Sequence, residues 1–194
     1  MRIGYGWDSH EFKAGIPLKL GGVALAHDKG LAGHSDGDVL LHALTDALLG
    51  AIAAGDIGTL FPPGDPQWKG ADSAIFIEEA MRQVEGAGYA VVNADSTLIL
   101  AAPKIAPHAR RIRQRVAELL KVDITCVGVK AKTPEGMGTD NAAIAHAVVL
   151  LQRRGDDEQL GVLEAAEELP QAVVDETVEE VLESVPEEPL KRRR

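Results

Sequence analysis

The sequence predicts an α+β protein of two layers, in which helices pack on one face of a small mixed β-sheet. Stretches with apolar residues at helical spacing occur among stretches that alternate, or run apolar, as strands do. Along the chain the predicted order is strand, hairpin, helix, helix, strand, helix, strand, strand. This order favours helices on one face of a mixed sheet.

The chain opens with a predicted strand over residues 1 to 7, whose glycines suit the close approach of another backbone. Asp8, Ser9 and His10 follow at once. If the extended conformation continues, Asp8 and His10 project from the same face, because strand side chains repeat every two residues. A carboxylate and an imidazole on one face form half of a metal site. Pro17 to Leu25 is then predicted to be a short strand or a hairpin.

A polar, turn-forming run at residues 34 to 38 leads directly into apolar residues at helical spacing. A functional loop is therefore mounted on a helix N-terminus. The backbone N–H groups and the dipole of such a terminus suit phosphate, and His34 and Ser35 add side-chain donors beside them. We expect the helix to run from about Asp38 to Ala53 and to stop at Gly55.

His42 lies one turn into this helix and shares a face with Asp38 and Asp46, because residues four apart stack on a helix. It is a candidate metal ligand. Asp38 or Asp46 is a candidate partner that orients the His42 ring. The alternative is that both carboxylates lie on the wet edge of the helix.

The remaining elements follow from composition and spacing. We expect residues 55 to 66 to form a rigid, turn-rich loop, and Asp72-Ser73 to cap a second helix that ends at Gly86 and Gly88. The apolar side of that helix is predicted at Ile75, Ile77, Ala80, Met81 and Val84.

Ala90 to Leu100 alternates as a strand, and Pro107 is well placed to start a third helix through Val122. Asp123 to Lys132 is strand-like. Ala142 to Gln152 is ambiguous by periodicity alone, although its run of valine and leucine favours a buried strand. The third helix is expected to carry a solvated outer face at Arg110, Arg111, Arg113 and Arg115.

Composition indicates a soluble chain of one domain and a tail. The hydrophobic share is 45% and the charged share 26%, and no segment approaches the apolar run needed to span a bilayer. We expect no signal peptide, because the start lacks an apolar core. Cys126 is the single cysteine, which excludes a disulfide framework and a thiolate zinc cluster and favours a reducing cytoplasm.

The net charge of −10 is concentrated in the tail. Residues 155 to 194 hold 13 acidic and 4 basic residues, which leaves 17 acidic and 16 basic residues in 1 to 154. Nucleic acid and anionic membrane are therefore poor partners for the nearly neutral body. We expect residues 1 to 154 to be one folded domain and residues 155 to 194 to be an acidic, flexible tail. The alternative is a partner-binding amphipathic helix, with valines at 174, 178, 181 and 185.

Asp8, His10 and His42 together offer three oxygen and nitrogen ligands, two close in sequence and one on a distant helix. Zinc suits this set, and three protein ligands leave the fourth tetrahedral position open, as in catalytic sites. The alternative is that these side chains are only hydrogen-bonded.

Glu135 sits in a Pro/Gly-rich turn just after Lys132 and Thr133, with Lys104 in the comparable loop at another strand end. A carboxylate among phosphate-binding donors suits magnesium. Two cations would imply a diphosphate. Such turns also occur with no ligand at all.

Several motifs occur in the order and at the spacing of one known protein family. They are Asp8-Ser9-His10, His34-Ser35-Asp36-Gly37-Asp38, Leu41 to Gly50, Gly55 to Gly58, Leu60-Phe61-Pro62, Lys69-Gly70-Ala71-Asp72-Ser73 and Ala102-Pro103-Lys104. With these motifs the chain closely resembles the 2-C-methyl-D-erythritol 2,4-cyclodiphosphate synthase family over residues 1 to about 152.

The resemblance implies an enzyme of the non-mevalonate (methylerythritol phosphate) route of isoprenoid biosynthesis. It would cyclise 4-diphosphocytidyl-2-C-methyl-D-erythritol 2-phosphate to 2-C-methyl-D-erythritol 2,4-cyclodiphosphate and release CMP. This is the reaction of a metal-dependent phosphorus–oxygen lyase, which we expect in the cytoplasm. The resemblance also implies a homotrimer with active sites between subunits.

Site residues are implied in the same way. Asp8, His10 and His42 match zinc ligands, Glu135 matches a ligand of magnesium or manganese, and His34 and Thr133 match transition-state stabilisers. The implied substrate contacts are Asp8, Ser9, His10, His34 and Ser35; the ribose-side loop Asp56, Ile57 and Gly58; the mobile loop Phe61, Pro62, Pro63, Gly64 and Asp65; the cytidine pocket Leu100, Ala101, Ala102, Pro103, Lys104, Ile105, Ala106 and Lys132; and Thr133, Pro134 and Glu135.

The chain departs from the family pattern at Thr139-Asp140-Asn141-Ala142, where many members place an aromatic residue and an arginine. In the family that turn borders a cavity on the trimer axis, which is suggested to hold isoprenoid diphosphates. Because the turn differs here, we do not infer that ligand for this chain. Trp7 and Lys132 also replace more usual residues, and neither change removes a ligand.

The residues alone leave two other functions open. One is a zinc-dependent phosphohydrolase that hydrolyses a nucleotide diphosphate, and the other is a non-catalytic, metal-dependent nucleotide-binding module. Product analysis in oxygen-18 water separates the three functions.

Overall fold

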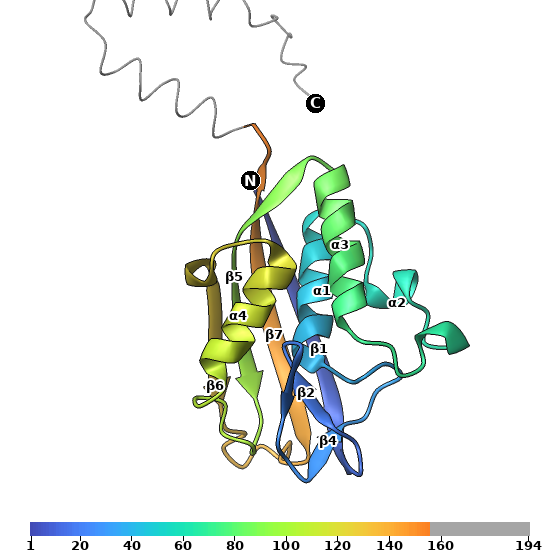
Figure 1. Cartoon of the computed structure of the whole chain (residues 1–194), viewed down its shortest axis with the longest axis vertical. Coiled ribbons are helices and arrows are strands. Elements are labelled where there is room, and N and C mark those ends of the chain that lie inside the picture. The colour runs from blue at the N-terminus through green and yellow to red at the C-terminus, as the bar shows by residue number, and fades with distance from the viewer. Residues whose placement is uncertain (156–194) are drawn as a thin grey trace, which may run out of the picture. The chain divides into compact units, whose positions relative to one another are not determined.

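The computed structural model describes residues 1–155, drawn in colour in Figure 1. The predicted tail lies outside the described residues from residue 156 onward. The strands are β1 (Arg2–Ala14), β2 (Leu18–Leu20), β3 (Val23–Leu25), β4 (Lys29–Leu31), β5 (Tyr89–Ile99), β6 (Val127–Lys132) and β7 (Ala142–Arg153). The helices are α1 (Val39–Ala51), α2 (Ile57–Leu60), α3 (Ala74–Gly86) and α4 (Ala109–Leu120), with 3-10 turns at Pro66–Trp68 and Ile124–Cys126.

The main sheet has five strands in the order β4-β1-β7-β5-β6. All neighbouring pairs are antiparallel except β5 and β6, which are parallel, so the sheet is mixed as predicted. β2 and β3 form the predicted hairpin as a small sheet of their own. β4, which pairs with the end of β1, was not predicted.

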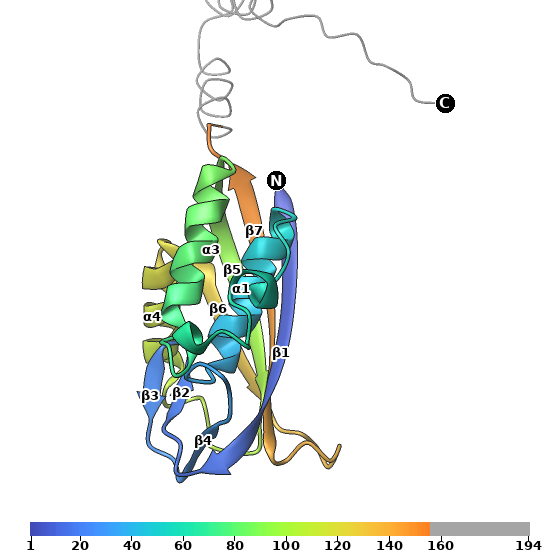
Figure 2. The same cartoon turned by 90° about the vertical axis from the view of Figure 1, so that its right-hand side faces the viewer.

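Helices α1, α3 and α4 cover one face of the main sheet, as Figure 2 shows from the side. α1 packs on β1 and β7, α4 packs on β6, and α3 packs against α1 and β5. This arrangement confirms the predicted α+β class with helices on a mixed sheet. Among the described residues, no helix has the length and apolar character that crossing a bilayer requires.

Two glycines of β1 let α1 lie close to the sheet. A Cβ atom at Gly4 would lie 1.8 Å from the carbonyl oxygen of Ala47, and one at Gly6 would lie 1.9 Å from that of Ala43. Because alternate strand residues face opposite sides, the even-numbered residues of β1 face the helices and the odd-numbered ones face away. This alternation places Asp8 and His10 on the side of α1.

α1 is enclosed on nearly every side, because the sheet covers one side and α3 packs against it. Its buried residues include Val39, Leu40, Leu41, Ala43, Leu44, Ala47, Leu48 and Leu49. His42 lies among them and is 8% exposed. A polar ring in such surroundings needs partners for both of its nitrogens.

Some predicted elements differ in detail from the structure. α1 ends at Ala51, two residues before the predicted end, and Ala53 then adopts a left-handed backbone with φ 58°. The one-turn helix α2 lies inside the loop predicted for residues 55 to 66. The strand predicted from Asp123 begins only at Val127, because the Asp123 carboxylate accepts the N–H of Thr125 and starts a 3-10 turn.

Two predicted faces were wrong in part. On α3, Ile75 is 44% exposed and Phe76 is buried in its place. On α4, Arg113 does not belong to a solvated face, because its guanidinium donates to the carbonyl oxygens of Val127 at 2.7 Å and Ile124 at 2.8 Å. Arg113 therefore ties α4 to the start of β6.

Candidate metal centre and substrate pocket

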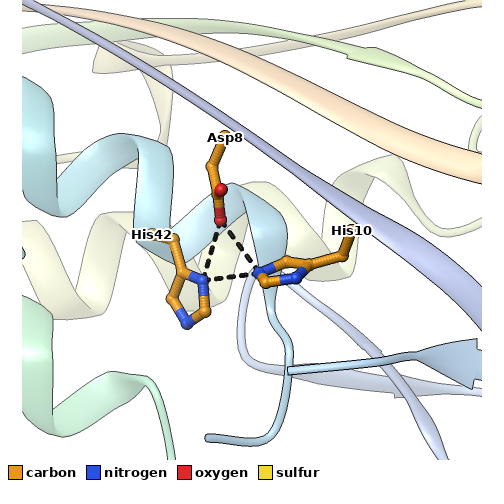
Figure 3. Close-up of side chains that lie close together, drawn as sticks. All are labelled: Asp8, His10 and His42. Carbon is orange, nitrogen blue, oxygen red and sulfur yellow. Dashed lines mark hydrogen bonds and ion pairs between the residues drawn. The ribbon is translucent and has the colours of Figure 1, made fainter. Parts of the chain in front are cut away.

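Three side chains converge at the junction of β1 and α1, as Figure 3 shows. Asp8 Oδ2 lies 2.9 Å from His42 Nδ1 and 3.0 Å from His10 Nε2. The two imidazole nitrogens are 2.9 Å apart. β1 supplies two of these residues from one face and α1 supplies the third, so the cluster depends on the close helix–sheet contact at Gly4 and Gly6.

The donor set fits a tetrahedral metal ion such as zinc. With bonds of about 2.0–2.1 Å, the ligand atoms of a tetrahedral zinc lie roughly 3.3 Å apart, close to the separations seen here. A carboxylate and two neutral imidazoles are ordinary zinc ligands, and the three ligand atoms lie near enough to one another to share one ion. The structure thus shows a candidate metal site formed by Asp8, His10 and His42.

Burial and hydrogen bonding have opposite effects on the pKa values of Asp8 and His10. Burial opposes the ionisation of Asp8, but hydrogen bonds to His10 and His42 outweigh burial and hold the pKa of Asp8 far below its usual range. Burial lowers the pKa of His10, but its hydrogen bond to Asp8 and the charge of that carboxylate outweigh burial, so the pKa of His10 is raised. Asp8 therefore stays ionised and can serve as an anionic ligand.

The expected partners of the His42 ring are not the ones found. Asp38 is fully buried and accepts N–H groups from Gly21 at 2.8 Å, Gly22 at 2.6 Å and Leu41 at 3.1 Å. It therefore caps α1 and fixes the β2–β3 turn, rather than lying on a wet edge or orienting His42.

Asp46 accepts the N–H of Ile57 at 2.8 Å and joins α1 to α2. The outer nitrogen of His42, Nε2, instead meets the hydroxyls of Ser35 at 3.0 Å and Ser73 at 2.9 Å. Spacing along one helix could not reveal these serines, because they come from a loop and from the start of α3.

A cavity of about 250 Å³ opens beside the three ligands. Asp8, His10 and His42 line it together with the predicted contacts His34, Ser35, Ile57, Gly58, Phe61 and Pro63. Asp46, which the sequence indicated only as a candidate partner of His42, also lines it, as do Trp68 and Phe76, which the sequence had not indicated as site residues. The rings of Phe61 and Phe76 pack 4.4 Å apart, centre to centre, and Trp68 stands edge-on to Phe61 at 4.9 Å.

Other predicted contacts near this cavity do not line it. The carboxylate of Asp56 caps α2, because it accepts hydrogen bonds from the hydroxyl and from the backbone N–H of Thr59, each at 2.7 Å. These two bonds lower the pKa of Asp56. Pro62, Gly64 and Asp65 belong to the following loop but are not among the lining residues. Ser9 faces the side of β1 away from α1, by the alternation described above.

A second hollow of about 540 Å³ gathers most of the predicted cytidine-side residues. The hydroxyl of Thr133 donates to the carboxylate of Glu135 there. Leu100, Ala101, Pro103, Lys104, Ile105, Ala106, Lys132, Thr133 and Glu135 line the hollow, whereas Ala102 and Pro134 do not. The cavity and the hollow share no lining residue, so the predicted site is divided within one chain.

Comparisons with known proteins match the sequence and the fold of the chain. The sequence model of the YgbB family matches residues 1–152. The chain is 64% identical over 154 residues to a 2-C-methyl-D-erythritol 2,4-cyclodiphosphate synthase of Koribacter versatilis, a match that covers 79% of this chain and 99% of the relative. It is 49% identical over 156 residues to the chloroplastic synthase of that name from Arabidopsis thaliana, covering 79% of this chain and 68% of the relative.

A solved structure gives the same result for the fold. It is a 2C-methyl-D-erythritol-2,4-cyclodiphosphate synthase in a CDP-bound form, 44% identical, with a TM-score of 0.74. The superposition covers 78% of this chain and all of the other chain. The likeness in sequence and the likeness in fold thus extend over the same share of the chain.

Proposed function

The chain belongs to the YgbB family, and we propose that it acts as a 2-C-methyl-D-erythritol 2,4-cyclodiphosphate synthase of the methylerythritol phosphate route to isoprenoids. It converts 4-diphosphocytidyl-2-C-methyl-D-erythritol 2-phosphate into the cyclic diphosphate and CMP. The observation that carries the proposal is the convergence of Asp8, His10 and His42 on one point in a cavity, in a chain so similar to such a synthase.

The reaction is an intramolecular phosphoryl transfer. An oxygen of the 2-phosphate forms a bond to the β-phosphorus, and the bond from that phosphorus to the oxygen shared with the α-phosphorus breaks, so that CMP departs with the electron pair. No water is consumed. Because the attacking and attacked groups belong to one molecule, holding the substrate folded supplies a large part of the rate enhancement.

The main obstacle is charge, since one anionic phosphate must approach another. Zinc held by Asp8, His10 and His42 would supply a Lewis acid with one open position. Magnesium or manganese on Glu135 would neutralise charge on the diphosphate. We therefore propose metal dependence and classify the reaction as that of a phosphorus–oxygen lyase.

The protein's own donors have separate tasks in this proposal. His34 and Ser35, on the cavity wall, donate to phosphate oxygens near the metal ligands. In the second hollow, Lys104 and Lys132 supply positive charge, and the Thr133 hydroxyl stabilises the charge that develops on the phosphorus oxygens. The apolar walls of that hollow suit the cytosine ring, which is consistent with the CDP-bound relative.

We propose that a homotrimer brings the two parts of the site together. Within one chain, the cavity and the hollow have no lining residue in common. If the hollow of one subunit meets the cavity of the next, metal ligands and cytidine contacts form one site. The active sites then lie between subunits.

The sheet face away from the helices suits this assembly. It carries large apolar side chains that are unusually exposed: Ile3 at 72%, Tyr5 at 59%, Trp7 at 49% and Val148 at 44%. Tyr5 pairs with Val148 in the β1–β7 ladder, so these side chains are neighbours. Contiguous exposed apolar surface of this kind marks interaction sites.

The cytoplasmic location stays a prediction.

Product identification tests the proposal. The full-length chain, given the cytidine substrate with zinc and magnesium, should yield the phosphorus NMR signals of a cyclic diphosphate and of CMP in equal amounts. His42→Ala should keep the circular dichroism of the wild type but lose both bound zinc and turnover. Linear products from the wild type, or full turnover by zinc-free His42→Ala, would contradict the proposal.

A further inference from the structure

The inner nitrogen of His42 faces the metal site, and its outer nitrogen is held by two serines. Nε2 lies 2.9 Å from Ser73 Oγ and 3.0 Å from Ser35 Oγ. Ser73 has no exposed surface, whereas Ser35 lines the substrate cavity. Ser73 is therefore the fixed partner of the ring, and Ser35 remains accessible to substrate.

Ser73 stands at the N-cap of α3 but makes no capping hydrogen bond with its side chain. Serine is common at this position because its oxygen usually accepts a backbone N–H of the first turn. Here the carboxylate of Asp72 accepts the N–H of Ala74 at 3.0 Å. The sequence had assigned the cap to Asp72-Ser73 together, and the structure gives the side-chain bond to Asp72. The Ser73 hydroxyl is committed elsewhere.

Its second partner is Asp36. The hydroxyl of Ser73 donates to Asp36 Oδ1, and the backbone N–H of Ser73 donates to Asp36 Oδ2 at 3.3 Å. Because an ionised carboxylate only accepts hydrogen bonds, the hydroxyl hydrogen points to Asp36. The Ser73 oxygen is then left to accept from His42 Nε2. A hydrogen on Nε2 leaves the lone pair of Nδ1 facing Asp8 and His10.

Lys19, from β2, fixes the orientation of Asp36. Its Nζ lies 3.0 Å from Asp36 Oδ2 and 3.1 Å from Asp72 Oδ2. With Oδ2 held by Lys19, Oδ1 stays directed at Ser73. The contacts therefore run in one direction, from Lys19 through Asp36 and Ser73 to the outer side of the His42 ring.

We propose that Asp36 and Ser73 are positioning residues that set the tautomer and orientation of His42 for metal binding. The inference rests on the proposed metal at Asp8, His10 and His42, and it adds the residues that prepare one of those ligands. Such a device is needed because Asp8 Oδ2, 2.9 Å from Nδ1, would otherwise favour a hydrogen on that nitrogen and so block it as a ligand. Outer partners of metal-bound histidines typically contribute about 10- to 100-fold in metal affinity.

Zinc affinity of full-length variants, measured by competition with a chelator, tests this proposal without any assay of turnover. Ser73→Ala should weaken zinc binding by about 10- to 100-fold. Ser96→Ala is the matched control. Ser96, in β5, is also buried, and its hydroxyl donates to the carbonyl oxygen of Gly128. This control should bind zinc as the wild type does.

Asp36→Asn tests the direction of the hydrogen bonds. Lys19 should keep the amide oxygen on its own side, so the amide NH₂ faces Ser73 and forces its hydroxyl to donate to His42. The ring hydrogen then moves to Nδ1, and zinc affinity should fall as in Ser73→Ala. Since Asp36 acts through Ser73, the double variant should lose no more affinity than Ser73→Ala alone.

The outcomes separate this inference from the function on which it rests. Wild-type zinc binding that Ser73→Ala leaves unchanged would overturn the relay and leave the metal site intact. Losses that add fully in the double variant would do the same, because they would show two independent structural effects. A wild-type chain that binds no zinc would overturn the proposed metal site and this inference together.

Discussion

The Nε2 atom of His34 donates a hydrogen bond to the backbone carbonyl oxygen of Asp65 over 3.0 Å. This bond crosses from the loop before α1 to the loop after α2, and both loops border the cavity of the metal ligands. His34 therefore has two roles in the proposed enzyme. It holds the loop of residues 61–65 through this bond, and we propose that it donates to a phosphate oxygen when substrate is bound.

For this reason His34→Ala should lower turnover much more than it weakens CDP binding. A donor whose bond strengthens as charge moves contributes mainly to the transition state, and losing one costs about 10²–10³-fold in kcat. Steady-state kinetics and calorimetric titration with CDP give the two numbers. Equal losses in both would make His34 a simple binding residue.

Thr133→Val should also reduce kcat, by roughly 100-fold, because the variant keeps the shape of threonine but removes its hydroxyl. The control is Thr125→Val. Thr125 likewise donates to a carboxylate two residues away, that of Asp123 at 2.6 Å, but lies outside both the cavity and the hollow. If Thr125→Val loses as much activity as Thr133→Val, the catalytic role of Thr133 is wrong.

The trimer prediction concerns the exposed sheet face. Ile3→Asp places a charge on a residue that is 72% exposed in the single chain, and it should shift the assembly to monomers and abolish turnover. Ile75→Asp is the control, since Ile75 is an exposed isoleucine on α3 in the other layer. Equilibrium sedimentation measures the assembly. An active monomer would contradict the shared-site proposal.

We also predict that residues 155 to 194 are dispensable for catalysis. A chain that ends at Arg154 should trimerise, bind zinc and turn over much like the full chain, because the family match ends at residue 152. Sedimentation and kinetics of the truncated chain check this. Loss of the trimer on truncation would show that the tail belongs to the assembly.

Local periodicity predicted the parts of the site that lie within single elements. The two-residue repeat of a strand placed Asp8 and His10 on one face, and the glycines of β1 indicated a close neighbour, which is α1. The apolar spacing around His42 predicted α1 to within two residues at its C-terminal end.

Other features depend on contacts between elements, which one sequence does not contain. Ser73 reaches His42 only because α3 begins beside α1, and its position at a helix start pointed to a cap instead. Arg113 looked like part of a charged surface because the carbonyl oxygens that it binds belong to later segments. The turn helix α2 is too short to show a helical repeat.

The most direct test of the cyclisation is turnover in water enriched in oxygen-18. An attack by the substrate's own 2-phosphate predicts a cyclic diphosphate and CMP that both lack solvent label, because no water enters the reaction. Label in CMP or in a linear product would show a phosphohydrolase. Unchanged substrate would show a metal-dependent nucleotide-binding module, and either result would contradict the proposed cyclisation.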